Sequence, residues 1–284
     1  MHGWRLATEH RRRFAAIWLH QPPQRYWSGP RQLDKVPPAR GTGRMRRAWP
    51  LPTPDDDEYP AMADFAQQRI NMVESQVRPS DITDRRIIRA MLELPREDFV
   101  PERMRAMAYM DEAVEVAPGN GEAAPRYLLP PRTLAKLIQL AGIDASAVVL
   151  DVGPATGYST ALLAKLATRV VALEADQGLC ATASATLSAL GLTNAQVLQG
   201  PLPAGAKSEG PFDAILLNGA VEVVDPDLID QLKEGGKMVG VLATGSFGRA
   251  HVWRRNGEAF DTRPDFDAAA PPIPGFARPA GFIF

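Results

Sequence analysis

The residues best suited to chemistry stand at one turn of the chain, in the segment Val148-Val149-Leu150-Asp151-Val152-Gly153-Pro154-Ala155-Thr156-Gly157. The segment is an apolar run that ends in an acid and continues into a Gly-rich loop, where the backbone can approach a ligand because glycine readily adopts positive φ angles. The pattern is D-x-G-x-A-x-G, not the G-x-G-x-x-G of dinucleotide-binding turns. Asp151 would repel a pyrophosphate, so the turn favours a ligand with a positive amino group.

A second acid, Glu174, stands 17 residues after Gly157, at the end of the next apolar run. An acidic side chain at the end of the second strand of such a unit can accept hydrogen bonds from ribose hydroxyls. Together the two features favour S-adenosylmethionine (SAM), which carries an amino acid moiety and an adenosine but no phosphate. The alternative interpretation is a tight turn next to an ordinary surface glutamate.

Histidine and cysteine, the usual catalytic and metal-binding residues, are scarce. The chain has one cysteine, Cys180, and four histidines, three of which lie within the first 20 residues. A disulfide framework and a multi-cysteine metal site are therefore excluded, and a Ser–His–Asp triad in the main body would depend on His251 alone. We expect no metal. SAM chemistry is compatible with this scarcity, because the methyl sulfonium is already reactive and a carboxylate acceptor is ionised at neutral pH. Catalysis can then rest on alignment in a dry pocket, although an Asp or Glu could still act as a base.

The elements that would position these residues form an α/β pattern. Helices are expected over residues 62–77, with Phe65, Ile70, Met72, Val73 and Val77 on the apolar face, and over 84–94 and 131–140, with irregular structure over 96–125. Continuous apolar runs then alternate with helical segments, which is typical of a twisted, mostly parallel sheet. The expected strands are 147–152, 170–173, 195–198, 212–217 and 237–242, with candidates at 249–255 and 280–284, and the expected helices are 160–167, 177–190 and 225–233.

Charge divides the chain near residue 62. Residues 1–54 hold ten Arg and one Lys against Glu9 and Asp34, a net charge of +9, whereas residues 62–284 carry a net charge of −6. A basic segment rich in Pro and Arg without periodicity predicts disorder over most of 1–61. It could be a targeting segment, a nucleic-acid or membrane-surface arm, or translated upstream sequence that precedes a native start at Met62, and we favour the last. Residues 62–284 are then a single domain. No apolar run approaches the roughly 18 residues of a membrane helix.

Several stretches resemble the protein-L-isoaspartate O-methyltransferase family, and the resemblance covers residues 65–284. The more specific part is N-terminal: Met72-Val73-Glu74-Ser75-Gln76-Val77-Arg78, Ile82-Thr83-Asp84, Ala90-Met91, Pro95-Arg96-Glu97-Asp98-Phe99-Val100-Pro101-Glu102 and Ala108-Tyr109. The resemblance implies a Rossmann-like SAM-dependent methyltransferase sheet with N-terminal helices packed over the site. It also implies methylation of the α-carboxyl of isoaspartyl residues in damaged proteins. The residues implied at or near the cofactor are Asp151, Gly153, Ala155, Gly157, Glu174, Asp213 and Asn218.

The substrate segment departs from the family pattern. The family typically has a Thr-Ile-Ser-Gln/Ala-Pro segment whose Ser helps to hold the substrate, and if Pro131 takes the place of that Pro, Leu129 replaces the Ser. Ala155 is a milder departure, where Gly or Ser is usual. Arg126 or Arg132 could supply a carboxylate clamp, because a guanidinium binds a carboxylate through two hydrogen bonds. Either arginine could equally be a solvated residue at a helix start.

The sequence therefore predicts a cytoplasmic, monomeric, SAM-dependent O-methyltransferase that repairs proteins carrying isoaspartate. Two alternatives remain: a methyltransferase of the same fold that acts on another acceptor, and a SAM-binding protein without turnover. We expect peptide or protein substrates, and neither nucleic acid nor a membrane as a partner. The catalytic residues, including any general base, are not identified by the sequence.

Overall fold

The computed structural model describes residues 64–119, 124–245 and 247–278. The basic segment 1–61 therefore lies wholly outside the described residues, and so does the strand expected over 280–284. Within the described ranges, no helix is both long and apolar enough to cross a membrane. The predicted α/β class with a mostly parallel sheet is confirmed.

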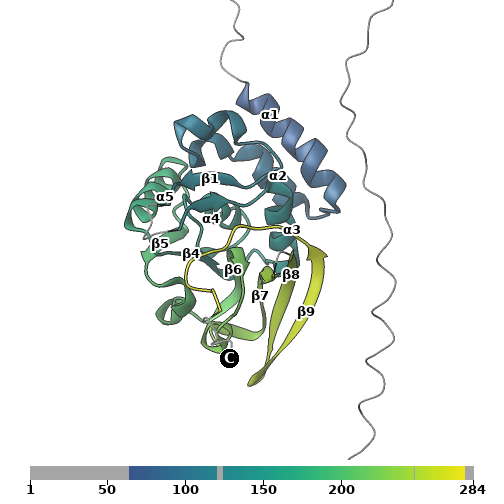
Figure 1. Ribbon diagram of the computed structural model, residues 1–284, viewed down its shortest axis with the longest axis vertical. Helices are drawn as coiled ribbons and strands as arrows, with labels where there is room; N and C mark the ends of the chain where they lie inside the picture. The colour runs from purple at the N-terminus through teal and green to yellow at the C-terminus, as the bar shows by residue number, and fades with distance from the viewer. Residues whose placement is uncertain (1–63, 120–123, 246, 279–284) are drawn as a thin grey trace, which may run out of the picture. The chain divides into compact units, whose positions relative to one another are not determined.

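A seven-stranded sheet forms the centre of the domain, in the order β5-β4-β3-β6-β7-β8-β9 (Figure 1). Neighbouring strands from β5 to β7 run parallel, and β8 and β9 each run antiparallel to the preceding strand. The central strands are buried along almost their whole length, as expected for apolar strands covered on both faces. Their bounds are β3 Val148–Val152, β4 Arg169–Glu174, β5 Ala195–Gln199, β6 Phe212–Val221, β7 Leu232–Thr244, β8 Phe247–Asn256 and β9 Ala259–Asp267.

The strand order places a topological switch at β3. The chain runs from β3 to β4 and β5 on one side, then returns to β6 and β7 on the other. In such sheets ligands bind beyond the carboxyl ends of the strands where the order reverses. Asp151 and Asn218 lie near the carboxyl ends of the neighbouring strands β3 and β6, so the fold brings these two predicted site residues to the switch point.

Helices connect the strands close to the predicted positions. Helix α3 starts at Pro131, as predicted, and Gly142 caps it in a left-handed conformation with φ of 65°. Helix α6 is shorter than the predicted 225–233, because a Pro-Asp turn begins it and residue 232 already starts the next strand. The bounds are α3 Pro131–Ala141, α4 Tyr158–Ala164, α5 Gln177–Ala189 and α6 Pro226–Ile229.

The N-terminal helices match the prediction with one correction. Helix α1 (Phe65–Met72) continues into a π-helical turn over Val73–Val77, and α2 covers Arg85–Glu93. Figure 1 shows α1 on the outer side of α2. Met72, Val73 and Val77 are buried, but Ile70 is 45% exposed, so its place on the apolar face was wrong. The inward face of α1 runs through Phe65, Arg69 and Met72 at helical spacing, and Ile70 falls beside this face, not on it.

Three strands were not predicted. Strand β1 (Val114–Ala117) lies in the stretch 96–125 that was expected to be irregular, β2 (Arg126–Leu128) directly follows that stretch, and the two strands pair antiparallel. They are only four and three residues long, too short to show periodicity among Pro and Gly. Strand β9 was missed because its residues are almost all exposed and carry no apolar pattern. It pairs with β8 in the long hairpin at the edge of the sheet (Figure 1).

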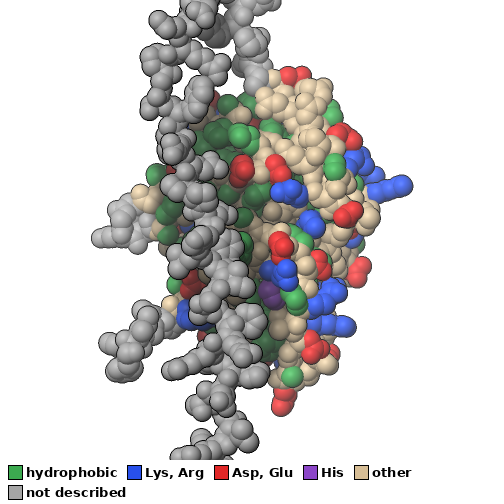
Figure 2. Space-filling view, turned by 45° about the vertical axis from the view of Figure 1, so that its right-hand side comes forward, with side chains coloured by type: hydrophobic (Ala, Val, Ile, Leu, Met, Phe, Trp, Pro, Cys, Tyr) green, Lys and Arg blue, Asp and Glu red, His purple; other side chains and the backbone are tan. Residues whose placement is uncertain are grey.

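Charged side chains are mixed in sign on the face shown in Figure 2, where Lys and Arg alternate with Asp and Glu. Exposed ion pairs among the described residues include Arg249 with Asp267 on the β8–β9 hairpin. The interior holds two apolar clusters, one of which includes the N-terminal helices, α3 and α4. The other is built on β3, β6 and β7 and includes Ile273 and Phe276 from the C-terminal segment.

Candidate functional site

The loop between β3 and α4, residues 153–157, has the backbone conformation that its sequence predicted. Gly153 and Gly157 have φ angles of 69° and 95°, in the left-handed region that glycine tolerates. Ala155 also has a positive φ, 53°, although it is not glycine. A Cβ at residue 157 would lie 3.1 Å from the Cβ of Ala183 on α5. Gly157 is therefore required for packing the loop against α5, and not only for access to a ligand.

Asp151 lies at the base of this loop and is fully buried. The hydroxyls of Ser159 and Thr160 donate to its Oδ2 at 2.8 and 2.7 Å, and the side-chain amide of Asn218 donates to its Oδ1. Burial raises the pKa of Asp151 to about 6, the nearby charge of Glu174 adds to the rise, and the three hydrogen bonds oppose it. In this arrangement Asp151 ties β3 to α4 and β6.

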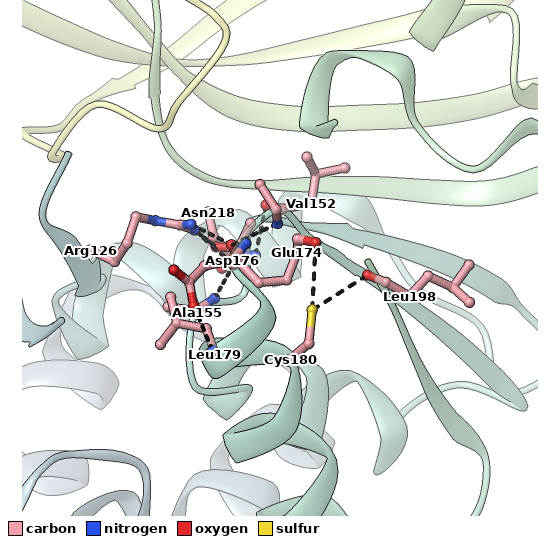
Figure 3. Close-up of polar contacts among 11 residues, drawn as sticks. Arg126, Val152, Ala155, Glu174, Asp176, Leu179, Cys180, Leu198 and Asn218 are labelled. Carbon is pink, nitrogen blue, oxygen red and sulfur yellow. Dashed lines mark hydrogen bonds and ion pairs between the residues drawn. The ribbon is translucent and has the colours of Figure 1, made fainter. Parts of the chain in front are cut away.

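Glu174, at the end of β4, is also fully buried, and its carboxylate accepts hydrogen bonds from five N–H donors. The backbone N–H groups of Ala155, Ala175 and Asp176 donate at 3.0, 2.8 and 3.2 Å. The other two donors belong to Arg126 on β2, whose Nη1 and Nη2 lie 2.5 and 2.9 Å from Oε1 and Oε2 (Figure 3). The alternative of an ordinary surface glutamate is therefore wrong.

Arg126 is held from two sides. Its Nη2 donates to the carbonyl of Gly153 at 3.1 Å as well as to Glu174, and the residue is only 5% exposed. A Cβ on Gly153 would lie 3.2 Å from this Nη2, so the absence of a side chain there lets the guanidinium sit against the loop. The alternative of a solvated arginine is therefore wrong for Arg126. Its guanidinium does bind a carboxylate through two hydrogen bonds, but in this structure the carboxylate is that of Glu174.

The two other predicted substrate residues lie in different surroundings. Leu129 is buried at 3% exposure, and its backbone carbonyl accepts a 2.8 Å hydrogen bond from Arg96 Nη2. Arg132, at the start of α3, is more than half exposed and pairs with Asp111 at 3.3 Å. Leu129 lines the same hollow as Arg126 and Asn218, whereas Arg132 does not line it.

Two hollows adjoin these residues. The first is lined by Arg126, Tyr127, Leu129, Asn218 and residues 271–273, and its side chains leave almost no free space. The second has room for at most about one water molecule and is lined by Tyr127, Leu128, Leu129, Leu134, Pro154, Tyr158, Ser159 and Asn218. Ligand pockets usually measure roughly 300–1,000 Å³. The glycine loop and Glu174 are of the right type and position to hold SAM, but this arrangement has too little room for it while Arg126 occupies Glu174.

Arg96 is a buried residue near the site that the sequence did not single out as functional. It is fully buried, donates from Nε to the carbonyl of Ala108 at 2.6 Å, and lies 4.7 Å from the ring centroid of Tyr158. Its Nη1 and the hydroxyl of Tyr158 have no hydrogen-bond partner. Arg96 belongs to the N-terminal stretch that carried the family resemblance, so that stretch reaches the substrate segment through Leu129.

Cys180 is half-buried on α5, with its Sγ 3.5 Å from the carbonyl of Glu174 and 3.9 Å from that of Leu198 (Figure 3). Burial raises the pKa of this thiol, and the charges of Glu174 and Asp176 add to the rise. A thiol with a raised pKa is a poor nucleophile. His251 lies on β8, where its Nδ1 contacts the carbonyl of Arg249 at 3.0 Å.

Comparison with known proteins gives a consistent picture. Residues 67–261 match the model of the protein-L-isoaspartate(D-aspartate) O-methyltransferase family. The chain is 36% identical over 189 residues to protein-L-isoaspartate O-methyltransferase 2 of Shewanella sediminis, covering 66% of this chain and 72% of that protein. It is 38% identical over 180 residues to protein-L-isoaspartate O-methyltransferase of Koribacter versatilis, covering 63% and 78%.

Solved structures show the same fold. One, a protein-L-isoaspartate O-methyltransferase, has a TM-score of 0.65 and 22% identity, with 73% of this chain and 66% of that chain covered. Another is a Plasmodium falciparum protein described as a beta-aspartate methyltransferase, in complex with S-adenosyl-L-homocysteine (SAH). It has a TM-score of 0.60 and 19% identity, with 74% of this chain and 98% of that chain covered.

Proposed function

The chain belongs to the protein-L-isoaspartate O-methyltransferase family, and we propose that it transfers the methyl group of SAM to the α-carboxyl of isoaspartyl residues in damaged proteins. The observation that carries this proposal is the arrangement of Glu174 beside the glycine loop. Three backbone N–H groups hold the Glu174 carboxylate at the carboxyl end of β4, beside the switch point of the sheet. An acid at this position can accept hydrogen bonds from ribose hydroxyls.

The site residues have distinct proposed roles. Glu174 binds the ribose, and the backbone of Gly153, Ala155 and Gly157 borders the cofactor. Asp151 and Asn218 fix the loop to β3 and β6, because Asp151 is satisfied by Ser159, Thr160 and Asn218. SAM supplies the electrophilic methyl group when bound. An acceptor carboxylate oxygen forms the new bond to carbon, and the electron pair of the broken C–S bond stays on sulfur, giving a methyl ester and SAH.

This chemistry requires no strong base at the site. The acceptor carboxylate is ionised at neutral pH, so the protein has to align oxygen, methyl carbon and sulfur and exclude water. The burial around Leu129, Tyr158 and Asn218 is suited to that task. We further propose that the protein works in the cytoplasm as a monomer, on peptide or protein substrates and not on nucleic acid.

A second candidate function is methyl transfer to a different acceptor. The second hollow is lined by Leu129, where the family typically places a Ser, together with Leu128, Leu134 and Pro154. The Leu129 side chain offers no hydrogen bond to a polar acceptor. This replacement would suit an acceptor that does not need the hydrogen bond of the Ser.

A methyl-transfer assay with an isoaspartyl peptide beside its normal aspartyl twin tests the proposed function. We expect methyl ester formation on the isoaspartyl peptide alone. In Glu174→Ala, SAH affinity measured by calorimetry should fall by about 1.5–3 kcal/mol, the scale of hydrogen bonds to a charged group. SAH binding without methylation of either peptide would reject the isoaspartyl acceptor and favour the second candidate. Absence of SAH binding would reject both.

A further inference from the structure

Arg126 and a SAM ribose require the same carboxylate. The five N–H donors at Glu174 approach both of its oxygens, and two of them come from the Arg126 guanidinium. The three backbone donors are fixed by the β4 end and the glycine loop. Arg126 is the only one of these donors carried on a long, flexible side chain. Binding of ribose hydroxyls at Glu174 therefore requires the guanidinium to leave.

The released guanidinium can turn toward the first hollow, which Arg126 already borders together with Leu129 and Asn218. The side chains around this hollow leave almost no free space in the free protein, so they must move apart to admit the guanidinium. The same hollow adjoins the segment that departs from the family pattern, where Leu129 offers no side-chain donor. A guanidinium that rotates from Glu174 into this space would supply the donor that the segment lacks, and it would bind a carboxylate through two N–H groups.

We propose that Arg126 is an exchangeable carboxylate clamp. In the free protein it binds Glu174, and after the cofactor ribose takes its place at Glu174 it binds the carboxylate of the methyl acceptor. This inference rests on the proposed function and adds a substrate-positioning residue to it. It also sets the order of binding, because the acceptor site is complete only once the cofactor site is filled.

Two opposite effects are expected from Arg126→Gln. SAH affinity, measured by calorimetry, should become about tenfold tighter, because the variant no longer populates a closed state that excludes the ribose. The KM for the isoaspartyl peptide should rise about ten- to a hundredfold, because the acceptor loses a charge-assisted hydrogen bond. Arg126→Lys keeps the charge but not the paired geometry, so its SAH affinity and its peptide KM should lie between those of the wild type and of Arg126→Gln. If Arg126 had only a structural role, Arg126→Gln would weaken both SAH binding and peptide binding.

Arg249→Gln is the matched control. Arg249 also pairs with a carboxylate, Asp267 at 2.7 Å, but on the exposed β8–β9 hairpin. Neither SAH affinity nor peptide KM should change in this variant. Circular dichroism and a thermal melt establish that each variant is folded. Unchanged or weaker SAH binding in folded Arg126→Gln would overturn the proposal.

The wild-type protein provides a test that needs no variant. The isoaspartyl peptide should bind at least about tenfold more tightly with saturating SAH than without it, since coupling between two sites is reciprocal. Equal peptide affinity in both conditions overturns the clamp exchange while leaving the proposed function standing. SAH binding with no peptide binding in either condition rejects the isoaspartyl acceptor, and the SAH affinity of Arg126→Gln then still decides whether Arg126 competes with the ribose.

Discussion

At the scale of single residues, the site is built from buried charges that are satisfied within the protein. Asp151 and Glu174 are both fully buried, and hydrogen bonds from hydroxyl, amide, backbone and guanidinium donors satisfy them. The sequence predicted the importance of both acids from their places at strand ends. It could not predict their partners, because Arg126 and Asn218 are 48 and 67 residues away from Glu174 and Asp151. The roles assigned to these residues in SAM binding remain predictions.

The raised pKa of Asp151 predicts a pH-dependent stability difference. The folded-state pKa of about 6 lies above the ordinary value of 3.8. The contribution of Asp151 to the free energy of unfolding is therefore fully favourable below pH 3.8 and is lost as pH rises through 6. Asp151→Asn removes this titration and lets the hydroxyls of Ser159 and Thr160 reorient. The unfolding free energy of the variant relative to wild type should therefore rise by about 2 kcal/mol from pH 4 to pH 8.

Denaturant unfolding of both proteins at each pH measures this difference. Subtracting the wild-type values cancels the titration of all other groups. A difference that stays constant across the pH range would show that Asp151 titrates at an ordinary pKa.

We expect the substitution Leu129→Ser to raise turnover and to lower the stability of the fold. Leu129→Ser restores the hydroxyl that the family typically has, and should raise kcat/KM for the isoaspartyl peptide roughly ten- to a hundredfold. Because Leu129 is buried, the same change should destabilise the fold by about 2–5 kcal/mol. Leu137→Ser, at a fully buried leucine of α3 that lines neither hollow, is the control with a similar cavity but no expected gain in turnover. Full activity in the unchanged protein would mean that another group, such as Arg126, has replaced the hydroxyl.

At the scale of elements, long apolar strands and capped helices were predictable, and short or exposed ones were not. The strands β3 to β6 and helix α3 stand within a few residues of their predicted bounds. For β3, β4 and β6 the reason is burial on both faces, which gives them nearly continuous apolar sequences. The β1–β2 pair was not predicted, yet it carries Arg126 to Glu174. Its position depends on long-range packing, which a local pattern does not record.

The junction of α4 with α5 predicts that Gly157 is essential to the fold. Gly157→Ala should destabilise the protein by about 2 kcal/mol or more, because a Cβ would combine a strained φ of 95° with a 3.1 Å contact to Ala183. Gly191→Ala separates the two effects, since Gly191 has a φ of 66° and nothing within 4 Å of its added Cβ. It should cost only about 1 kcal/mol for backbone strain. Equal losses in chemical denaturation of the two variants would mean that the contact with α5 contributes nothing.

At the scale of the whole molecule, family membership and fold agree over the same part of the chain. The family model matches residues 67–261, and the sheet with its N-terminal helices spans residues 65–267. The predicted resemblance to this family is confirmed. The division of the chain into a basic segment over 1–61 and a domain over 62–284 stays a prediction, because that segment lies wholly outside the described residues.

Removal of residues 1–61 tests that division. The first 54 residues of this segment carry a net charge of +9 and include eight prolines, so by composition the segment can bury little apolar surface. The shortened chain should therefore keep its melting temperature within about 2 °C and its SAH affinity within about twofold, as expected for removal of a segment that packs on nothing. Thermal melts and calorimetry of the two chains at matched salt concentration provide the comparison. A loss of several degrees would show that the basic segment packs on the domain, and unchanged melting with weaker SAH binding would instead give it a role at the cofactor site.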